Sequence, residues 1–188
     1  MSRSYCEAVR SGSLHTVHTV YHDHHYGFPI NDDDALFERL MLEINQAGLS
    51  WEIILKKQQG FREAFDGFNL EKVAAYGEED RVRLLSDAGI IRNRLKVSAA
   101  IENANRILEI QEEHGSFSAW LDFHHPLELI AWQKLFKNTF VFTGGEIVRE
   151  FLTSTGYLSG AHDSDCRVFE QIHKLEPAWM RSQIERKV

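Results

Sequence analysis

The chain has 188 residues, and its 21 Lys+Arg against 28 Asp+Glu give a formal net charge of −7. A chain of this length predicts one compact unit over residues 1–188, because domains commonly contain roughly 100–200 residues. With 43% hydrophobic and 26% charged residues, the composition excludes a disordered, collagen-like or coiled-coil chain. The apolar runs are too short to span a membrane, and no signal-like stretch is present, so we expect a soluble cytoplasmic protein. The negative charge argues at first against a polyanionic partner.

The hydrophobic pattern predicts an all-α fold of about eight or more short helices. Residues 1–33 are rich in histidine and aromatics and lack helical periodicity, so we expect a loop-rich arm there. From Asp34 to Ala47 a stripe of apolar positions three and four residues apart predicts the first helix, capped by aspartates and ended by Gly48. Further helices are expected at 51–57, 61–65, 70–76, 78–87, 92–115, 117–123, 126–134, 145–155 and 168–175. The best strand-like pattern is the short run 140–142.

Cysteine and histidine recur near both ends of the chain. Cys6 and His22 lie in the predicted arm, and His162 and Cys166 are four residues apart near the C-terminus. One helical turn would bring the second pair together, and the first pair would complete a tetrahedral Cys₂His₂ site without an open position. Such a metal would be structural and would link the ends, about 1–33 and 156–170. The alternative is that the residues are scattered and the thiols are simply small buried side chains.

Glu43 is a candidate functional carboxylate. It lies on the apolar stripe of the helix predicted from Asp34 to Ala47, where an isolated charge would cost several kcal/mol to bury. A carboxylate at this position needs a partner, so it either binds a polar or cationic ligand in a pocket or pairs with an arginine or helix-terminal amides. The sequence leaves both interpretations open.

The segment from Gln46 to Trp51 predicts a tight turn beside an aromatic surface. Gly48 ends one helix, and Leu49, Ser50 and Trp51 follow directly. Together with Tyr21, Tyr26 and Phe28 of the arm, Trp51 could line a pocket that stacks a flat ring. Aromatic residues near helix ends also commonly belong to the core, which is the alternative.

Residues 81–96 are locally basic in an acidic chain. They contain five basic residues and one acid, Asp87, a balance of +5 − 1 = +4. The turn around Gly89 joins two predicted helices, and its amides with neighbouring cations would bind phosphates. We therefore expect a hairpin element over about 81–101; the alternative is a solvated helix corner. The cations concerned are Arg81, Arg83, Arg92, Arg94 and Lys96.

These features occur together, and in this order, in one known family. From Tyr21 to about Cys166 the sequence resembles the DNA-3-methyladenine glycosylase I family of helix-hairpin-helix DNA glycosylases. The motifs that carry the resemblance are Tyr21-His22-Asp23 with Gly27, Leu42-Glu43, Gln46-Ala47-Gly48-Leu49-Ser50-Trp51, Leu55-Lys56-Lys57, Asp87-Ala88-Gly89-Ile90-Ile91-Arg92, and His162-x-x-x-Cys166.

The resemblance implies a zinc-stapled helix-hairpin-helix glycosylase fold and a monofunctional hydrolase that excises 3-methyladenine in base excision repair. Cys6, His22, His162 and Cys166 would hold one structural zinc ion. Glu43 would be the catalytic residue, with Tyr21, Tyr26 and Trp51 in the base pocket. Gly48, Leu49, Gly89, Arg92, Arg94 and Lys96 would contact double-stranded DNA that contains alkylated bases. We expect a monomer with no membrane partner.

The chain departs from the family pattern at several positions. Ala8 and Tyr26 stand where the family commonly has tryptophan, Ile44-Asn45 replaces the usual Gly-Gln, and the tail over 168–188 differs. Ala8 and Tyr26 favour an alternative function, a zinc-stabilised protein that binds lesions without excising them. A third possibility is a small-molecule purine-binding module. The charge balance outside residues 81–96 is −7 − 4 = −11, which predicts one-sided, salt-sensitive contact with DNA.

Overall fold

The computed structural model describes residues 4–185, and within that range the chain is helical without a strand, as the sequence predicts. Residues 1–3 and 186–188 of the predicted unit lie outside the described residues. Within the described range, no helix combines the length and apolar character needed to cross a bilayer. The helices are α1 (Tyr5–Arg10), α2 (Thr16–His24), α3 (Asp33–Gln46), α4 (Trp51–Ala64), α5 (Leu70–Ala74), α6 (Glu78–Ser86), α7 (Arg94–His114), α8 (Phe117–His124), α9 (Leu129–Thr139), α10 (Gly145–Ser154), α11 (Phe169–His173) and α12 (Ala178–Glu185).

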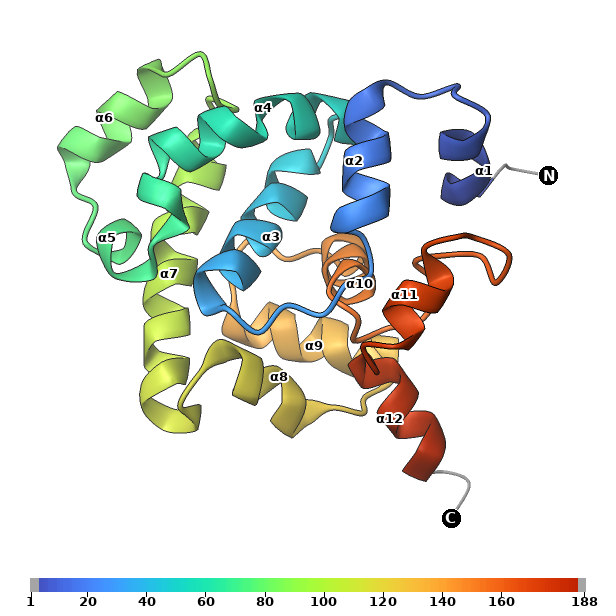
Figure 1. The fold of residues 1–188 in the computed structure, drawn as a ribbon. Coiled ribbons are helices and arrows are strands. Elements are labelled where there is room, and N and C mark those ends of the chain that lie inside the picture. Colours follow the sequence, from blue (N-terminus) through green and yellow to red (C-terminus); the bar gives the residue numbers. More distant parts are fainter. Residues whose placement is uncertain (1–3, 186–188) are drawn as a thin grey trace.

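Helix α3 forms the centre of the main core, with α4, α7, α8, α9 and α10 around it (Figure 1). Its N-terminus is fixed by Asp32, whose side chain accepts the N–H of Ala35 at 2.8 Å. The next residue, Asp33, accepts the N–H groups of Phe117 and Ser118, which ties α3 to the start of α8. Leu36 is fully buried in the core. The result is a rigid helix whose third turn carries Glu43.

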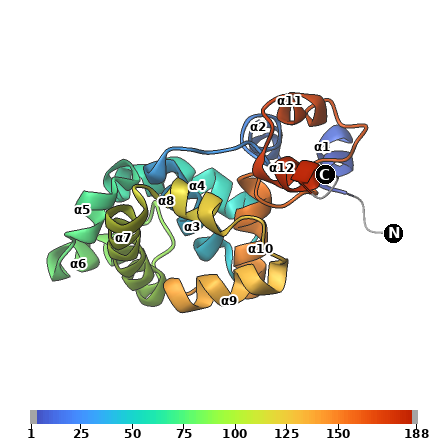
Figure 2. The same ribbon diagram turned by 90° about the horizontal axis from the view of Figure 1, so that it is seen from below.

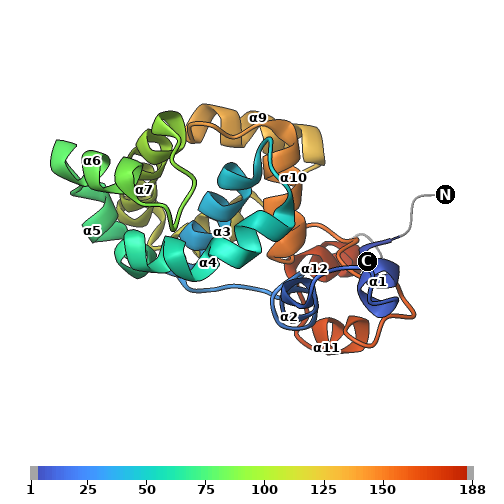
Figure 3. The ribbon, with the colours of Figure 1, turned by 90° about the horizontal axis from the view of Figure 1, so that it is seen from above.

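The two ends of the chain lie together on one side of the molecule. Helices α1, α2, α11 and α12 gather there, away from α5 and α6 (Figures 2 and 3). A small separate cluster of buried side chains joins α1 to α11 and the segment before it; it consists of Cys6, Cys166, Val168 and Ile172. The exposed ion pair between Arg10 and Asp165, at 3.1 Å, links the same segments. The two segments that carry the predicted metal ligands therefore lie close together in the described part of the chain.

The prediction that residues 1–33 form a loop-rich arm is wrong, because this segment contains α1 and α2. Ser4 and Glu7 form a capping box at the start of α1, and His15 caps α2 through its side chain. The apolar periodicity is weak because the buried faces of these helices contain tyrosine and histidine. Tyr21 and His22 of α2 are both buried.

Several helix boundaries also differ from the prediction. The helices expected at 51–57 and 61–65 are one helix, α4, which runs through Gly60. The helix expected at 126–134 begins and ends later, as α9, and α12 is not among the helices that the hydrophobic pattern predicts. The run 140–142 is no strand, and Phe142 has a φ of 62°, which interrupts any extended backbone there.

The backbone of the turn between α6 and α7 passes close to the backbone of α4. A Cβ atom on Gly60 would lie 2.6 Å from the carbonyl oxygen of Gly89, so glycine is required where the two backbones meet. Lys57 donates to the carbonyl of Ala88 at 2.6 Å, and the N–H of Gly89 donates to Asp87 at 2.6 Å. These contacts hold the turn between α6 and α7 against α4.

Candidate active site and metal centre

A cavity of about 490 Å³ lies between the terminal helices and the central helix α3. It brings together Tyr21, Tyr26, Glu43 and Trp51, which are the four pocket residues that the sequence predicts. These side chains come from α2, the segment after it, α3 and the first residue of α4. The other lining residues are Tyr5, Ala8, Leu14, His18, Gln46, Glu146 and Glu150.

Glu43 is a buried carboxyl group that faces this cavity. Its residue is 4% exposed, and it makes no hydrogen bond or ion pair with another described residue. Burial raises its pKa from 4.5 to about 8; the nearby charge of Arg39 opposes this rise and the carboxylates of Glu150 and Glu146 add to it. The carboxyl group is therefore mostly protonated at neutral pH, and a cationic ligand would favour its ionised form.

Tyr21 is held against α3 by Arg39. The guanidinium Nη1 donates to the Tyr21 hydroxyl oxygen at 3.3 Å and to the carbonyl of Ser154 at 3.2 Å. The guanidinium also lies over the Tyr21 ring, 5.1 Å from its centroid. Burial raises the pKa of Tyr21 well above its usual value. The hydroxyl thus keeps its proton and accepts from Arg39, which leaves its hydrogen available to a ligand.

The aromatic side chains that line the cavity contact one another edge to face. Trp51 and Tyr21 have centroids 5.1 Å apart and planes at 67°. Tyr26 donates its hydroxyl to Glu150 at 3.2 Å and meets the ring of Tyr5 edge-on at 5.5 Å. Each ring is therefore held in place by a neighbour, and the wall presents aromatic surface to the cavity.

The sequence reasoning missed the acidic side of the cavity. Glu146 and Glu150 project from α10, and Arg149 lies 2.5 Å and 2.7 Å from their carboxylates. The four-residue spacing of these glutamates on a predicted helix was the available signal. Nothing in the sequence placed that helix beside Glu43, because the contact between α3 and α10 is long-range.

The turn after α3 has the predicted form, with Gly48 at a φ of 81°. Gln46 donates to the carbonyl of Leu49 at 2.9 Å, and Leu49 is half-buried against the core. The sequence places Lys96 among the cations expected to contact DNA, but the structure buries it. It is 5% exposed, and its ammonium donates to the carbonyls of Asn45 and Ala47, both at 2.8 Å. Lys96 satisfies the carbonyls at the C-terminus of α3, where a cation is favourable.

The other hairpin cations divide into two groups. Arg81 donates to Ser98 at 2.7 Å, and Arg83 donates to the carbonyl of Ala64 at 2.8 Å, so both are engaged within the protein. Arg92 and Arg94 are exposed beside the turn and make no ion pair within residues 4–185. The local charge that can meet a phosphate is therefore carried by these two arginines.

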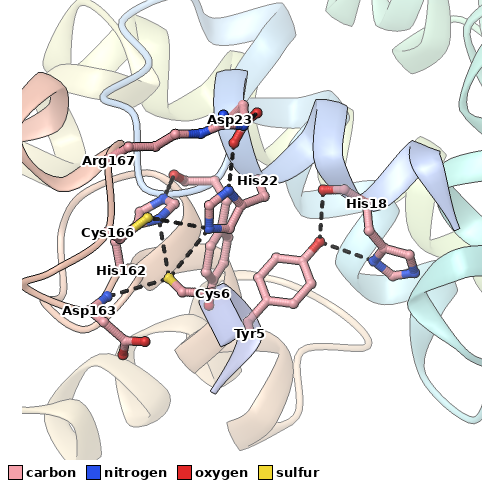
Figure 4. A network of polar contacts seen from close by, with 10 residues as sticks. Tyr5, Cys6, His18, His22, Asp23, His162, Asp163, Cys166 and Arg167 are labelled. Carbon is pink, nitrogen blue, oxygen red and sulfur yellow. Dashed lines mark hydrogen bonds and ion pairs between the residues drawn. The ribbon is translucent and has the colours of Figure 1, made fainter. Parts of the chain in front are cut away.

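Cys6, His22, His162 and Cys166 come together as the sequence predicts (Figure 4). All four are buried, and one ligand atom from each lies within 4.8 Å of the others. The Cys6 sulfur is 3.3 Å from His22 Nε2 and 3.6 Å from His162 Nδ1, and the Cys166 sulfur is 3.6 Å from each of the same two nitrogens. Such a group could hold a metal ion.

Neighbouring groups orient these side chains. His22 Nδ1 contacts Asp23 at 2.8 Å, and His162 Nε2 contacts the carbonyl of Tyr26 at 2.8 Å, which directs the other nitrogen of each ring at the sulfurs. Burial raises the pKa of Cys6, so a thiolate at this position needs a compensating cation. His162 and Cys166 lie in a turn rather than on a helix, since Cys166 donates its N–H to Asp163.

Comparison with known proteins identifies the sequences and structures that this chain resembles. The methyladenine glycosylase family matches residues 12–131. DNA-3-methyladenine glycosylase 1 of Escherichia coli (strain K12) is 46% identical over 101 residues, which are 54% of each chain. This chain therefore matches about half the length of that relative. DNA-3-methyladenine glycosylase of Haemophilus influenzae is 31% identical over 170 residues, covering 80% of this chain and 91% of the relative.

Solved structures show the same fold. That of 3-methyladenine DNA glycosylase I from Staphylococcus aureus, determined to explain 3-methyladenine recognition, has a TM-score of 0.78 and 32% identity over 88% of this chain and 97% of its own. A variant of 3-methyladenine DNA glycosylase I in complex with 3-methyladenine has a TM-score of 0.74 and 33% identity, covering 84% of this chain and 95% of its own. The chain therefore belongs to the 3-methyladenine DNA glycosylase I family and has its all-helical fold.

Proposed function

We propose that this protein is a monofunctional DNA glycosylase that hydrolyses the N-glycosidic bond of 3-methyladenine in double-stranded DNA, as part of base excision repair. The observation that carries the proposal is the unpartnered, buried carboxyl group of Glu43 in an aromatic cavity. Similar proteins bear the name of this activity, and one was solved with 3-methyladenine bound.

In this mechanism, the damaged nucleotide flips out of the duplex and its base enters the cavity. Methylation at N3 gives the base a positive charge, so it leaves as a neutral molecule once the bond to the sugar breaks. Water adds to the sugar carbon and releases its proton. Glu43 ionises to pair with the cationic base, the Tyr21 hydroxyl offers its hydrogen, and Trp51 and Tyr26 supply π-surface that attracts the cation. Binding selects the substrate because the cationic base needs little help to leave.

The DNA would lie across the turn after α3 and the hairpin between α6 and α7. Gly48 and Leu49 would occupy the gap left by the flipped base. The amides around Gly89, with Arg92 and Arg94, would bind phosphates in the manner of a helix-hairpin-helix element. Lys96 supports this surface from inside by holding the carbonyl of Ala47.

The Cys and His cluster would hold a structural zinc ion. Tetrahedral zinc with sulfur ligands at 2.3 Å and nitrogen ligands at 2.0–2.1 Å would place sulfur and nitrogen about 3.6 Å apart. The sulfur–nitrogen distances of 3.3–3.6 Å fit this arrangement. Four protein ligands leave no position for water, so the ion would stabilise the fold and take no part in hydrolysis. Elemental analysis should find one zinc per chain in unchelated protein and none in Cys166→Ser.

The decisive experiment for the function is release of 3-methyladenine from methylated duplex DNA. The wild type should release the base, and Glu43→Gln should not. If the wild type releases none, while it and Glu43→Gln bind damaged DNA equally, the enzymatic function is excluded.

We also infer a cytoplasmic monomer; light scattering after size exclusion tests the monomer, and imaging of the tagged protein in cells tests its location.

The second candidate is a zinc-stabilised protein that binds lesions without excision, which Ala8 and Tyr26 favour because they change the cavity wall. It predicts tight binding of methylated DNA by the wild type with no released base. A purine-binding module, the third possibility, would bind free 3-methyladenine and show no salt-dependent affinity for DNA.

A further inference from the structure

The loop between α9 and α10 presents apolar side chains to solvent beside the turn after α3. Val141 and Phe142 are adjacent in this loop, and both are 39% exposed. They line an open groove of about 970 Å³, whose lining also includes Ala47 at the C-terminal end of α3. The α9–α10 loop therefore lies next to Gly48 and Leu49, which would fill the gap left by a flipped base.

Hydrogen bonds fix the α9–α10 loop in this conformation. The side-chain amide of Asn103, which is fully buried on α7, accepts the N–H of Val141 at 2.9 Å and donates to the carbonyl of Val141 at 3.1 Å. Thr143 donates its hydroxyl to the carbonyl of Phe136 at 3.1 Å. The exposed apolar side chains thus have a fixed position on the surface.

Phe142 adopts a backbone conformation that is unfavourable for a residue with a side chain. Its φ is 62°, in the left-handed region. Its ring lies with its centroid 5.9 Å from the ammonium of Lys96, the same group that binds the carbonyls of Asn45 and Ala47. Lys96 therefore connects Phe142 to the end of α3. Backbone strain of this kind gathers at sites where a ligand is bound.

The segment that leads into the loop is positively charged. Residues 129–145 contain Lys134 and Lys137 and no acidic residue, in a chain whose net charge is −7. Both lysines line the groove and are exposed, and neither ammonium has a hydrogen-bond or ion-pair partner within the described part of the chain. Glu146 follows the loop, and Arg149 balances its charge at 2.5 Å. The groove therefore combines apolar surface with two unpaired cations.

Duplex DNA is the partner that this combination fits. Its phosphates attract unpaired lysines, and its minor groove accepts apolar side chains that pack between or against base steps. The position of the groove favours DNA over a protein partner, because Ala47 joins it to the turn that the proposed function places at the flipped base. Arg94, at the start of α7, lies two residues before Lys96 and brings the hairpin close to the same surface. A duplex that receives Leu49 would pass over the groove.

We propose that the α9–α10 loop is a third DNA-binding segment, in addition to the turn after α3 and the hairpin. Val141 and Phe142 pack against the minor groove beside the step that Leu49 occupies, and Lys134 and Lys137 bind the flanking phosphates. This inference rests on the proposed glycosylase function, which places DNA on this side of the molecule. Because hydrogen bonds already fix the loop, little of its conformational freedom is lost when DNA binds.

The test measures affinity for duplex DNA that carries a stable abasic analogue, because such DNA has no base to enter the cavity. Fluorescence anisotropy at several salt concentrations gives the affinity and its dependence on salt. Phe142→Asn should weaken binding by about tenfold or more and leave the salt dependence unchanged, since the lost contact is uncharged. Lys134→Ala and Lys137→Ala should each lower the slope of log affinity against log salt by about 1.

Matched controls lie outside the groove. Phe123→Asn removes a ring that is 72% exposed on α8, and Lys174→Ala removes an exposed cation at the end of α11. Both should bind the abasic duplex like the wild type. Asparagine is used at position 142 because it adopts the left-handed conformation more readily than most residues. Thermal unfolding checks the fold of each variant; if Phe142→Asn does not fold, the two lysine variants on the surface of α9 decide.

The outcomes separate this inference from the proposed function. If the wild type releases 3-methyladenine and the three variants keep its affinity and salt slope, the inference is overturned and the glycosylase function stands. Equal losses in the variants and their controls also overturn it. Weaker binding of free 3-methyladenine by Phe142→Asn would do the same, because the variant would then act through the base cavity. If the wild type releases no base but the variants bind DNA as predicted, the loop binds DNA and the enzymatic function is refuted.

Discussion

Replacing Glu43 by glutamine should stabilise the free protein. The folded state keeps the Glu43 carboxyl protonated up to a pKa of about 8, compared with an ordinary value of 4.5. In the pH range between these two pKa values, the Glu43 carboxyl is ionised in the unfolded chain and protonated in the folded chain. The free energy of unfolding of the wild type therefore falls as pH rises. At pH 7 this costs about 3 kcal/mol, from 2.5 units at 1.36 kcal/mol each. Glutamine is neutral at every pH and avoids this cost.

Thermal unfolding of metal-loaded wild type and Glu43→Gln at pH 6, 7 and 8 measures the effect. The variant should be more stable by about 2 kcal/mol at pH 6 and about 4 kcal/mol at pH 8. For a chain of this size, each kcal/mol raises Tm by about 2–4 °C. Glu113→Gln is the matched control, since the side chain of Glu113 is 78% exposed; its Tm should follow that of the wild type at all three pH values.

A variant that is less stable than the wild type, or whose advantage does not grow with pH, would refute this reasoning. Either result would mean that the Glu43 carboxylate is paired within the folded protein and has a structural role. It would then not be an unpaired group that is available to a ligand. We expect Glu43→Gln to be more stable than the wild type and to release no 3-methyladenine. At such a site, the residue that is required for function lowers the stability of the protein.

Three further predictions concern the proposed DNA-binding surface. Arg92→Ala and Arg94→Ala should each reduce the slope of log affinity for DNA against log salt by about 1, measured by fluorescence anisotropy; unchanged slopes would remove these arginines from the phosphate contacts. Lys96→Met should instead destabilise the protein by about 3 kcal/mol in urea unfolding, because two carbonyls lose a charged donor; a variant with wild-type stability and a lower salt slope would contradict its internal role. Gly60→Ala should cost about 1–3 kcal/mol and weaken DNA binding through the hairpin, whereas Gly144→Ala, where a Cβ meets open space, should change neither; equal effects of the two would disprove the close approach.

Sequence patterns predicted the parts of this structure that depend on residues close together in the chain. The stripe around Glu43 predicted α3 and the burial of that carboxyl, and Gly48 predicted the end of the helix. The spacing of His162 and Cys166 allowed a shared ligand cluster whether the segment is a helix or a turn. These features depend on side-chain periodicity and on ligand chemistry, both of which are visible in a single sequence.

The unpredicted parts depend on tertiary contacts. Helix α2 lacked an apolar stripe because its buried face carries His22, which serves the cluster, and Tyr21, which serves the cavity. Lys96 looked like its basic neighbours, and only the position of the end of α3 shows why it is buried. Glu150 reaches the cavity through packing between α3 and α10, which no local pattern encodes.

The cluster of Cys6, His22, His162 and Cys166 also depends on the order in which the chain is made. Tyr21 and Tyr26, on the cavity wall, lie beside ligands from the first part of the chain, but the cluster needs His162 and Cys166, which are made after α3 to α10. The central helices can pack as they emerge, since they form their own core. The contacts of Cys6 and His22 with His162 and Cys166 can form only when those last residues have been made. An incomplete chain would therefore have a folded body whose terminal helices lack the cluster that joins them.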